Sequence, residues 1–208
     1  MQKHPVTGMV MATLMEAKPF VTDIPLEKTE EYPFPVFSNE KIILIISGIG
    51  KANAAMATFF LCQAYSPKII LNMGAAGAAK DGFSPGDIFH IKHIVEYDRP
   101  DFKTGHPHRY KPFVLDGFRL ADIATQDKPV IHPEHRKNVS ELAGLVDMEA
   151  ASVAHACGKF DIPSTFFKYV TDTPDHHEEE NIIKYIKMFR KPFSRFVITS
   201  VLPKLFNM

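Results

Sequence analysis

The sequence predicts an α/β protein in which helices cover both faces of a sheet. Ile42–Ile46 is an unbroken apolar run rich in β-branched residues, typical of a strand buried on both faces. The next segment, Lys51–Tyr65, has high helical propensity, and Pro67 ends it. Ile69–Met73 is then a second buried strand. Because strands and helices alternate, we expect one α/β sheet between two helical layers.

Further elements are expected along the whole chain. We predict strands at residues 8–14, 87–95 and 165–170, helices at 147–160, 178–190 and 192–205, and a loop over 99–112. The segment 116–146 has no readable pattern. Since no repeat or linker divides the chain, we expect one domain over residues 1–208.

The composition disfavours several classes of function. Lys and Arg together number 24, equal to Asp and Glu, so no net field favours nucleic acid or an anionic membrane as partner. No stretch has the roughly 20 apolar residues of a membrane helix, and residues 1–5 do not resemble a signal peptide. We expect a cytoplasmic protein whose Cys62 and Cys157 are reduced core thiols.

The glycine-containing segment 47–52 does not match a nucleotide-binding loop. A P-loop requires glycine where Ile45 stands, and Ser or Thr where Ala52 follows Lys51. A dinucleotide fingerprint requires its third glycine at Asn53. A tight turn between strand and helix is the favoured interpretation.

Two other features leave their roles open or predict no site. Gly74–Gly77 follows a buried strand, where small residues suit either a turn or a close approach to a ligand. Histidines pair at short range, but none has the Cys or carboxylate support of a metal site; the pairs are 106/108, 132/135 and 176/177. Residues 175–180 resemble a polar helix start. We therefore expect no metal and no cofactor.

Three carboxylates stand in apolar surroundings near predicted strand ends. Glu16 follows the first strand, Glu149 opens an apolar helix, and Asp172 ends the last strand. A single carboxylate of this kind is usually a helix cap or half of an ion pair. Three at the ends of strands in one sheet instead indicate an active site.

Several motifs together resemble the nucleoside phosphorylase and nucleosidase superfamily, most closely its methylthioadenosine/adenosylhomocysteine nucleosidases. The resemblance runs from Gly8 to about Asp175, and its specificity lies in the order and spacing of the motifs. These motifs are Gly48-Ile-Gly50-Lys51-Ala-Asn53-Ala-Ala55, Asn72-Met-Gly74-Ala-Ala-Gly77, Gly86-Asp87-Ile88, Asp147-Met148-Glu149-Ala150 and Thr171-Asp172.

The resemblance implies a three-layer αβα sandwich around a mixed, barrel-like sheet, usually in a homodimer. It implies that Glu16 deprotonates the attacking water, and that Met148 and Glu149 bind the ribose. Asp172 would protonate the purine at N7 or bond its exocyclic group. Such an acid would need a dry pocket to stay protonated.

The chain also departs from the family pattern. Ala75 replaces a Ser that bonds the nucleophile in many relatives, and with Gly77 it is expected to border the substrate. Lys128-Pro129 falls near the position of an aromatic residue that stacks on adenine in the nucleosidases.

The predicted function is hydrolysis of the N-glycosidic bond of a purine ribonucleoside, plain or 5′-modified. A phosphate-dependent phosphorylase of the same fold is the first alternative. It is disfavoured because segment 12–17 carries an acid and no Arg. A nucleoside-binding protein without turnover is the second alternative.

Overall fold

The structure, a computed structural model, describes residues 6–130, 132–175 and 179–208. His176, His177 and Glu178, included in the predictions above, lie outside the described residues. The strands are β1 Thr7–Met11, β2 Glu27–Glu30, β3 Val36–Ser38, β4 Ile42–Ile46, β5 Ile69–Ala78, β6 Ile88–Pro100, β7 Pro107–Tyr110, β8 Leu120–Thr125, β9 Leu145–Asp147 and β10 Ser164–Asp172. The helices are α1 Leu14–Asp23, α2 Lys51–Tyr65, α3 Pro133–Ser140, α4 Ala150–Lys159, α5 Glu179–Phe196 and α6 Leu202–Phe206, with a π-helical turn at Val197–Val201.

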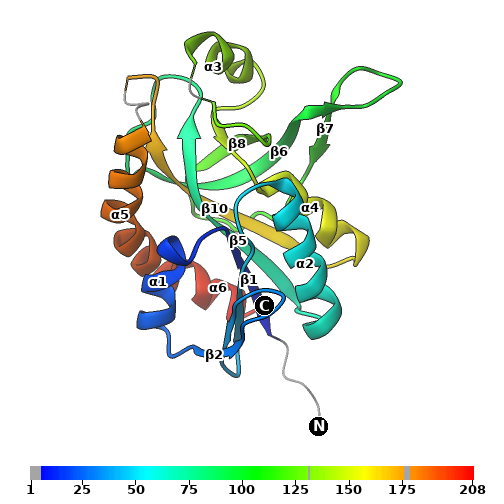
Figure 1. The fold of residues 1–208 in the computed structure, drawn as a ribbon, viewed down its shortest axis with the longest axis vertical. Coiled ribbons are helices and arrows are strands. Elements are labelled where there is room, and N and C mark those ends of the chain that lie inside the picture. Colours follow the sequence, from blue (N-terminus) through cyan, green and yellow to red (C-terminus); the bar gives the residue numbers. More distant parts are fainter. Residues whose placement is uncertain (1–5, 131, 176–178) are drawn as a thin grey trace.

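The strands form one mixed sheet that is partly closed. Its order is β10-β6-β8-β9-β5-β1-β4-β3-β2, and an additional pairing of β10 with β5 closes the first five strands into a barrel. The other four strands extend from β5 as an open sheet, and β7 pairs with β6 as a projecting hairpin (Figure 1). The strand β5 therefore belongs to both parts of the sheet.

One edge of β5 is divided between two neighbours. Its first residues, Ile69–Asn72, pair with β1, and Gly77 and Ala78 pair with β9. The opposite edge pairs with β10 from Ile70 to Gly77. Within the described residues, positions 73–76 thus have no strand partner on the divided edge, which leaves an opening between the open sheet and the barrel.

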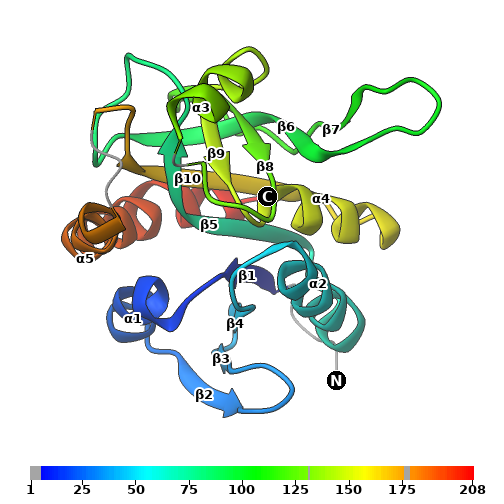
Figure 2. The ribbon, with the colours of Figure 1, turned by 45° about the horizontal axis from the view of Figure 1, so that its top comes forward.

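Helices cover both faces of the sheet, as predicted. The α2–α4 pair packs on one side, and α1, α5 and α6 pack on the other, each layer over its own apolar core (Figures 1 and 2). The short helix α3 lies above the barrel, over a third, smaller core that includes Val130 and Val139 (Figure 2). The predicted three-layer fold with a barrel-like mixed sheet is confirmed.

Several local predictions are also confirmed. The strand Ile42–Ile46 and the helix Lys51–Tyr65 have the predicted bounds. Cys62 and Cys157 are free and buried on α2 and α4. The favoured turn before α2 is present, and Gly48 and Gly50 have φ of +86° and +98°, a region that favours glycine.

Other predictions for the first half of the chain need correction. The strand from Ile69 does not end at Met73 but continues through Gly74–Gly77, because β10 pairs alongside it. The first strand stops at Met11, and Thr13 caps a helix, α1, that was not predicted. The charged, exposed strand β2 was also missed.

Three corrections concern the second half. The helices predicted at 178–190 and 192–205 are not separated there, because α5 continues through Pro192 to Phe196. The segment 99–112 is not all loop, because β6 reaches Pro100 and β7 pairs back onto it. The helix predicted from Asp147 begins at Ala150, because Asp147 ends β9 and its Oδ2 accepts the Ala150 N–H at 2.9 Å. The segment 116–146, unreadable in the sequence, holds β8, α3 and the start of β9.

Candidate active site

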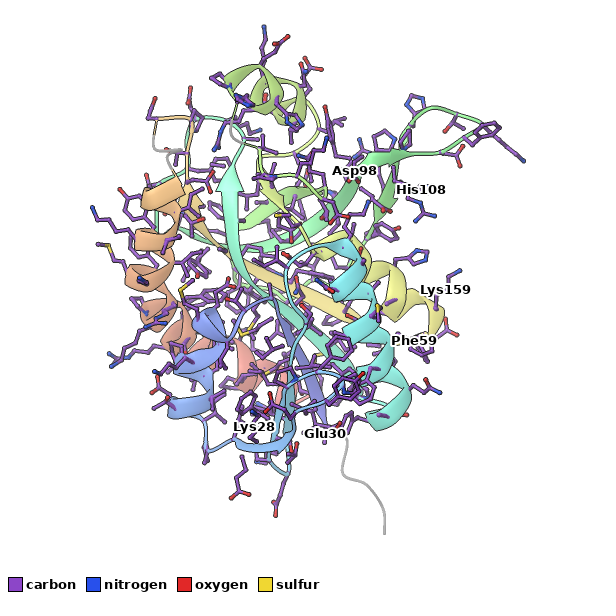
Figure 3. The ribbon with its side chains drawn as sticks, viewed as in Figure 1. Lys28, Glu30, Phe59, Asp98, His108 and Lys159 are labelled. Carbon is purple, nitrogen blue, oxygen red and sulfur yellow. The ribbon has the colours of Figure 1, made fainter. Side chains whose placement is uncertain are left out.

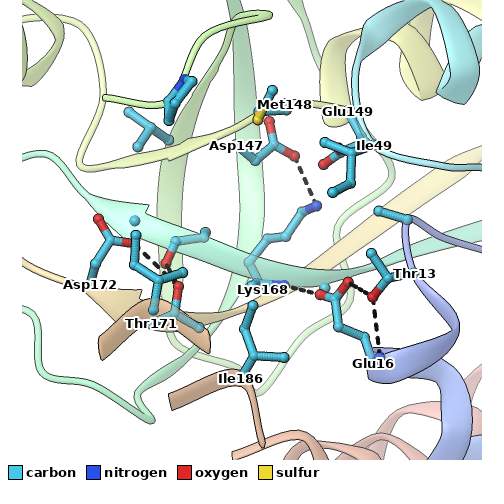
Figure 4. Close-up of a pocket in the computed structure, with 18 of the residues that line it drawn as sticks. Thr13, Glu16, Ile49, Asp147, Met148, Glu149, Lys168, Thr171, Asp172 and Ile186 are labelled. Atoms are coloured by element: carbon cyan, nitrogen blue, oxygen red, sulfur yellow. Dashed lines mark hydrogen bonds and ion pairs between the residues drawn. The ribbon is translucent and has the colours of Figure 1, made fainter. Parts of the chain in front are cut away.

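A cavity of about 560 Å³ opens at the divided edge of β5 (Figure 4). Its volume fits a ligand of nucleoside or drug size. The wall is built from the β1–α1 junction, the small residues of β5, the junction of β9 with α4, the end of β10, and α5. Elements distant in sequence thus meet where β5 lacks a neighbour.

Glu16 fills the gap in the edge of β5. Its Oε1 accepts the Ala75 N–H at 2.9 Å, a donor that a neighbouring strand would otherwise occupy. Thr13, the N-cap of α1, donates its hydroxyl to Glu16 Oε2 at 2.6 Å and accepts the Glu16 N–H at 3.2 Å. A Cβ at Gly74 would lie 3.0 Å from Oε1, so glycine gives the carboxylate room. Glu16 is thereby fixed with both oxygens facing donors.

Lys168 lies fully buried in the wall of the cavity, paired with Asp147 at 2.8 Å. Asp147 also accepts from the Thr125 hydroxyl at 2.6 Å, so its oxygens are satisfied. Burial lowers the pKa of Lys168, but Asp147, Glu149 and then Glu16 outweigh that effect and raise it overall. Lys168 is therefore a cation held among carboxylates.

One oxygen of Glu149 accepts a hydrogen bond, and the other has no hydrogen-bond donor among the residues that the structure describes. Its Oε1 accepts the Gly50 N–H at 2.9 Å, which links it to the glycine turn before α2. Burial, and next the charge of Asp147, raise the pKa of Glu149 to about 7, while Lys168 and the Gly50 N–H oppose the rise. This carboxyl group therefore changes protonation near neutral pH.

Asp172 lies on the opposite side of the cavity from Glu16 (Figure 4). Its Oδ2 accepts a hydrogen bond from Arg136 Nη2 at 2.5 Å, and its Oδ1 accepts from the Thr171 hydroxyl at 3.2 Å. Gly77 is required beside it, because a Cβ there would lie 2.6 Å from Asp172 Oδ2. An ion pair and a glycine together fix this carboxylate at the end of β10.

The remaining wall is mostly apolar. Lys128, Pro129 and Val130 form the side near α3, and three isoleucines of α5 line another part of the wall. These isoleucines are Ile182, Ile183 and Ile186. A ligand here would meet a few fixed polar groups within apolar surroundings, as is usual for small-molecule sites.

All six residues predicted for the site line this one cavity: Glu16, Ala75, Gly77, Met148, Glu149 and Asp172. Sequence reasoning missed Thr13, Asp147, Lys168 and Arg136. Lys168 had a signal, as the single charge within the apolar run 166–170. Arg136 had none, because it falls in the unreadable segment.

Two features are absent from residues 6–130, 132–175 and 179–208. In those ranges, no group of three or more His, Cys, Asp or Glu is arranged to hold a metal ion. None of their helices is long and apolar enough to span a membrane.

A family model described as the phosphorylase superfamily matches residues 7–128, more than half of the chain. The chain belongs to the phosphorylase superfamily. Among curated proteins, this superfamily member is similar to the 5′-methylthioadenosine/S-adenosylhomocysteine nucleosidase of Buchnera aphidicola, with 27% identity over 77% of this chain and 80% of the relative. The nucleosidase of the same name from Listeria monocytogenes is 22% identical over 89% and 91%.

Solved structures show the same fold for this superfamily member. A mutant of the Helicobacter pylori enzyme MTAN, with 5′-methylthioadenosine in its active site, has a TM-score of 0.85 at 20% identity, over 94% of this chain and 97% of the other. Arabidopsis thaliana 5′-methylthioadenosine nucleosidase has a TM-score of 0.83 at 23% identity, over 94% of both chains. Futalosine hydrolase of Helicobacter pylori has a TM-score of 0.81 at 21% identity, over 93% and 95%.

Proposed function

We propose that this chain is a purine nucleosidase, which hydrolyses the N-glycosidic bond of a purine ribonucleoside, plain or 5′-modified. The observation that carries the proposal is one cavity with Glu16 and Asp172 on opposite sides and Glu149 in the wall. The names of the curated relatives support the same activity. No cofactor is part of the proposal.

The proposed reaction uses Glu16 and Asp172, the carboxylates on opposite sides of the cavity, in different roles. A water oxygen attacks C1′ of the ribose, and the electron pair of the C1′–N9 bond passes to the purine. Glu16 accepts the proton that the water loses, while Asp172 protonates the purine at N7 or bonds its exocyclic group. Protonation lets the purine leave as a neutral molecule, which reduces the charge separation in an oxocarbenium-like transition state.

The charge of the cavity favours water over phosphate as the acceptor. The cations among the described lining residues are Lys128 and Lys168, and Lys168 is paired with Asp147. Glu16 on the acceptor side would repel an anion. Phosphorolysis is therefore the second candidate, supported by the name of the superfamily rather than by the charges of this pocket.

The other walls suit the rest of the substrate. Met148 would pack under the ribose, and Oε2 of Glu149, which accepts no hydrogen bond from the described part of the chain, would accept from the ribose hydroxyl groups. Pro129 and Val130 would border the base in place of the family's aromatic residue. The isoleucines of α5 would contact an apolar group at the 5′ position.

We also propose a homodimer located in the cytoplasm. Met56 and Phe59, three residues apart on α2, are 63% and 52% exposed, and Figure 3 shows Phe59. Ile49, in the turn before α2, is 56% exposed and also lines the cavity. Phe102, on the projecting β6–β7 hairpin, is fully exposed. A second copy would cover these exposed apolar side chains, of which Ile49 borders the pocket. The two free cysteines suit a reducing compartment.

The first prediction is that turnover does not need phosphate. With a purine ribonucleoside in phosphate-free buffer, the protein should release free base and free sugar in equal amounts. The measurement is chromatographic identification of both products, with and without added phosphate. A strict need for phosphate and formation of the sugar 1-phosphate would exclude hydrolysis as the function.

The second prediction concerns Glu16 and Asp172. Glu16→Gln and Asp172→Asn should each lower kcat by about 10²–10⁴-fold, because each removes one proton transfer. Circular dichroism and thermal unfolding serve as the folding controls for these near-isosteric changes. A folded variant with the parent rate would refute the role of its residue. Parent protein that binds nucleosides without turnover would support the binding-protein alternative.

The third prediction follows from the pKa of Glu149, raised to about 7. The carboxyl group gains a proton as pH falls through that value, so the charged carboxylate that accepts strongly from the ribose hydroxyls is replaced by a neutral, weaker acceptor. The ratio of kcat/KM for a ribonucleoside to that for its 2′-deoxy analogue should fall about tenfold between about pH 8 and about pH 6.

Groups whose titration changes kcat/KM equally for both substrates do not affect this ratio, because their effects cancel. In Glu149→Gln the ratio should be low and independent of pH, while Met148→Leu should leave it close to the parent value. A ratio that stays constant in the parent over this pH range would withdraw the sugar-reading role from Glu149.

The fourth prediction concerns the dimer. The parent should have the mass of two chains by light scattering coupled to gel filtration. Met56→Lys combined with Phe59→Lys should give single chains with a raised KM, because charge is introduced into an apolar contact. Met188→Lys on α5 is the matched control, since Met188 is similarly exposed on a different helix from Met56 and Phe59. A parent mass of one chain would exclude the homodimer.

A further inference from the structure

Arg136 makes the closest polar contact to the proposed acid, although it does not line the cavity. It extends from α3, is almost completely buried, and pairs with Asp172 Oδ2 at 2.5 Å. Its Nη1 also donates to the carbonyl oxygen of Ala78 at the end of β5. The guanidinium is thus fixed between β5 and β10, directly behind the carboxylate.

The side chain of Asp172 is held in one orientation by its neighbours. Thr171 donates to the second carboxylate oxygen, and the missing side chain of Gly77 creates the space that the carboxylate fills. With the charge-assisted bond from Arg136 on Oδ2, a bound base would contact Oδ1, which also accepts the longer hydrogen bond from Thr171. A buried charge of this kind is stable only while its partner stays in place.

The helix α3 also connects Arg136 to the wall of the cavity. His135, next to Arg136, is 3.1 Å from Gln126 Oε1, at the start of the segment that continues to Pro129 and Val130. Val130 and Val139 share the small core beneath α3. The guanidinium and the wall proposed to border the base therefore belong to one packed unit.

We propose that Arg136 is a positioning residue that acts through Asp172 on departure of the purine; this inference rests on the nucleosidase activity proposed above. Because Arg136 holds Oδ2, Oδ1 is the atom from which the proton passes to N7: the Asp172 O–H bond breaks, the N7–H bond forms, and the carboxylate returns to its pairing with the guanidinium. The expected contribution of Arg136 is the fixed orientation of the proton-donating oxygen toward the purine. Loss of Arg136 should therefore lower kcat and leave KM nearly unchanged.

The test is a double-mutant cycle on the full-length protein. Arg136→Gln should lower kcat by about 10–10²-fold with KM within about threefold, as expected when a reacting group loses its fixed orientation. In the Asp172→Asn background the same change should alter kcat by less than about twofold, because the group through which Arg136 acts is gone. Effects that multiply instead would show that Arg136 acts independently of Asp172 and would overturn the proposal.

Two further variants separate charge from packing. Arg136→Lys keeps the charge but not the fork that reaches both Ala78 and Asp172, so its loss of kcat should be about three- to tenfold. Equal losses for Lys and Gln would point to packing and overturn the proposal. Arg119→Gln is the matched control, because Arg119 pairs with Asp87 at the surface, and it should keep the parent kcat.

The double-mutant cycle can be measured even if the Arg136→Gln variant does not fold. If Arg136→Gln does not fold, the cycle is run with Arg136→Lys, whose loss should disappear in the Asp172→Asn background. If the parent proves to need phosphate, the nucleosidase function fails, but the cycle still tests Arg136 because the purine departs in the same way. If the parent turns over no purine nucleoside, both proposals fall.

Discussion

The hydrogen bond from the Ala75 N–H to Glu16 marks the point on which this architecture depends. The strand β5 is shared by a barrel and an open sheet, and its two neighbours on one edge leave a gap between them. Buried backbone donors need partners, and here a carboxylate from α1 supplies one. The break in the sheet therefore creates a cavity and places a carboxylate in its wall.

The charges around this gap explain why buried carboxylates so close together can coexist. Lys168 offsets Asp147, whose oxygens also accept hydrogen bonds from Thr125 and Ala150. The charge of Lys168 also stabilises the ionised form of Glu149, but one oxygen of Glu149 has no hydrogen-bond donor among the described residues. A satisfied carboxylate and an available one thus lie two residues apart, so neighbouring acids have different capacities to bind a ligand.

The fold was predictable where local patterns and tertiary context agree. Ile42–Ile46 and Lys51–Tyr65 have clear patterns and clear ends, so their bounds are correct. The strand β5 was predicted too short because Gly74–Gly77 resembles a turn, whereas pairing with β10 keeps it extended. The charged strand β2 has no apolar pattern and forms through its pairing with β3.

The site was predictable through its carboxylates but not through their partners. Glu16, Glu149 and Asp172 stand out as acids in apolar segments near strand ends. Their partners come from elements that the sequence does not connect, since Arg136 lies 36 residues from Asp172 in a segment without a pattern. Thr13 was overlooked because α1 was not predicted, and an N-cap has meaning only beside its helix.

The anchoring of Glu16 by a main-chain amide has a consequence for substitutions at position 75. A backbone N–H is present whatever side chain occupies position 75, unless proline replaces it. A mutation of Ala75 to Ser or another small residue therefore leaves the anchor of the carboxylate in place. The side chain at position 75 can change without loss of this hydrogen bond, whereas loss of the carboxylate at position 16 removes it.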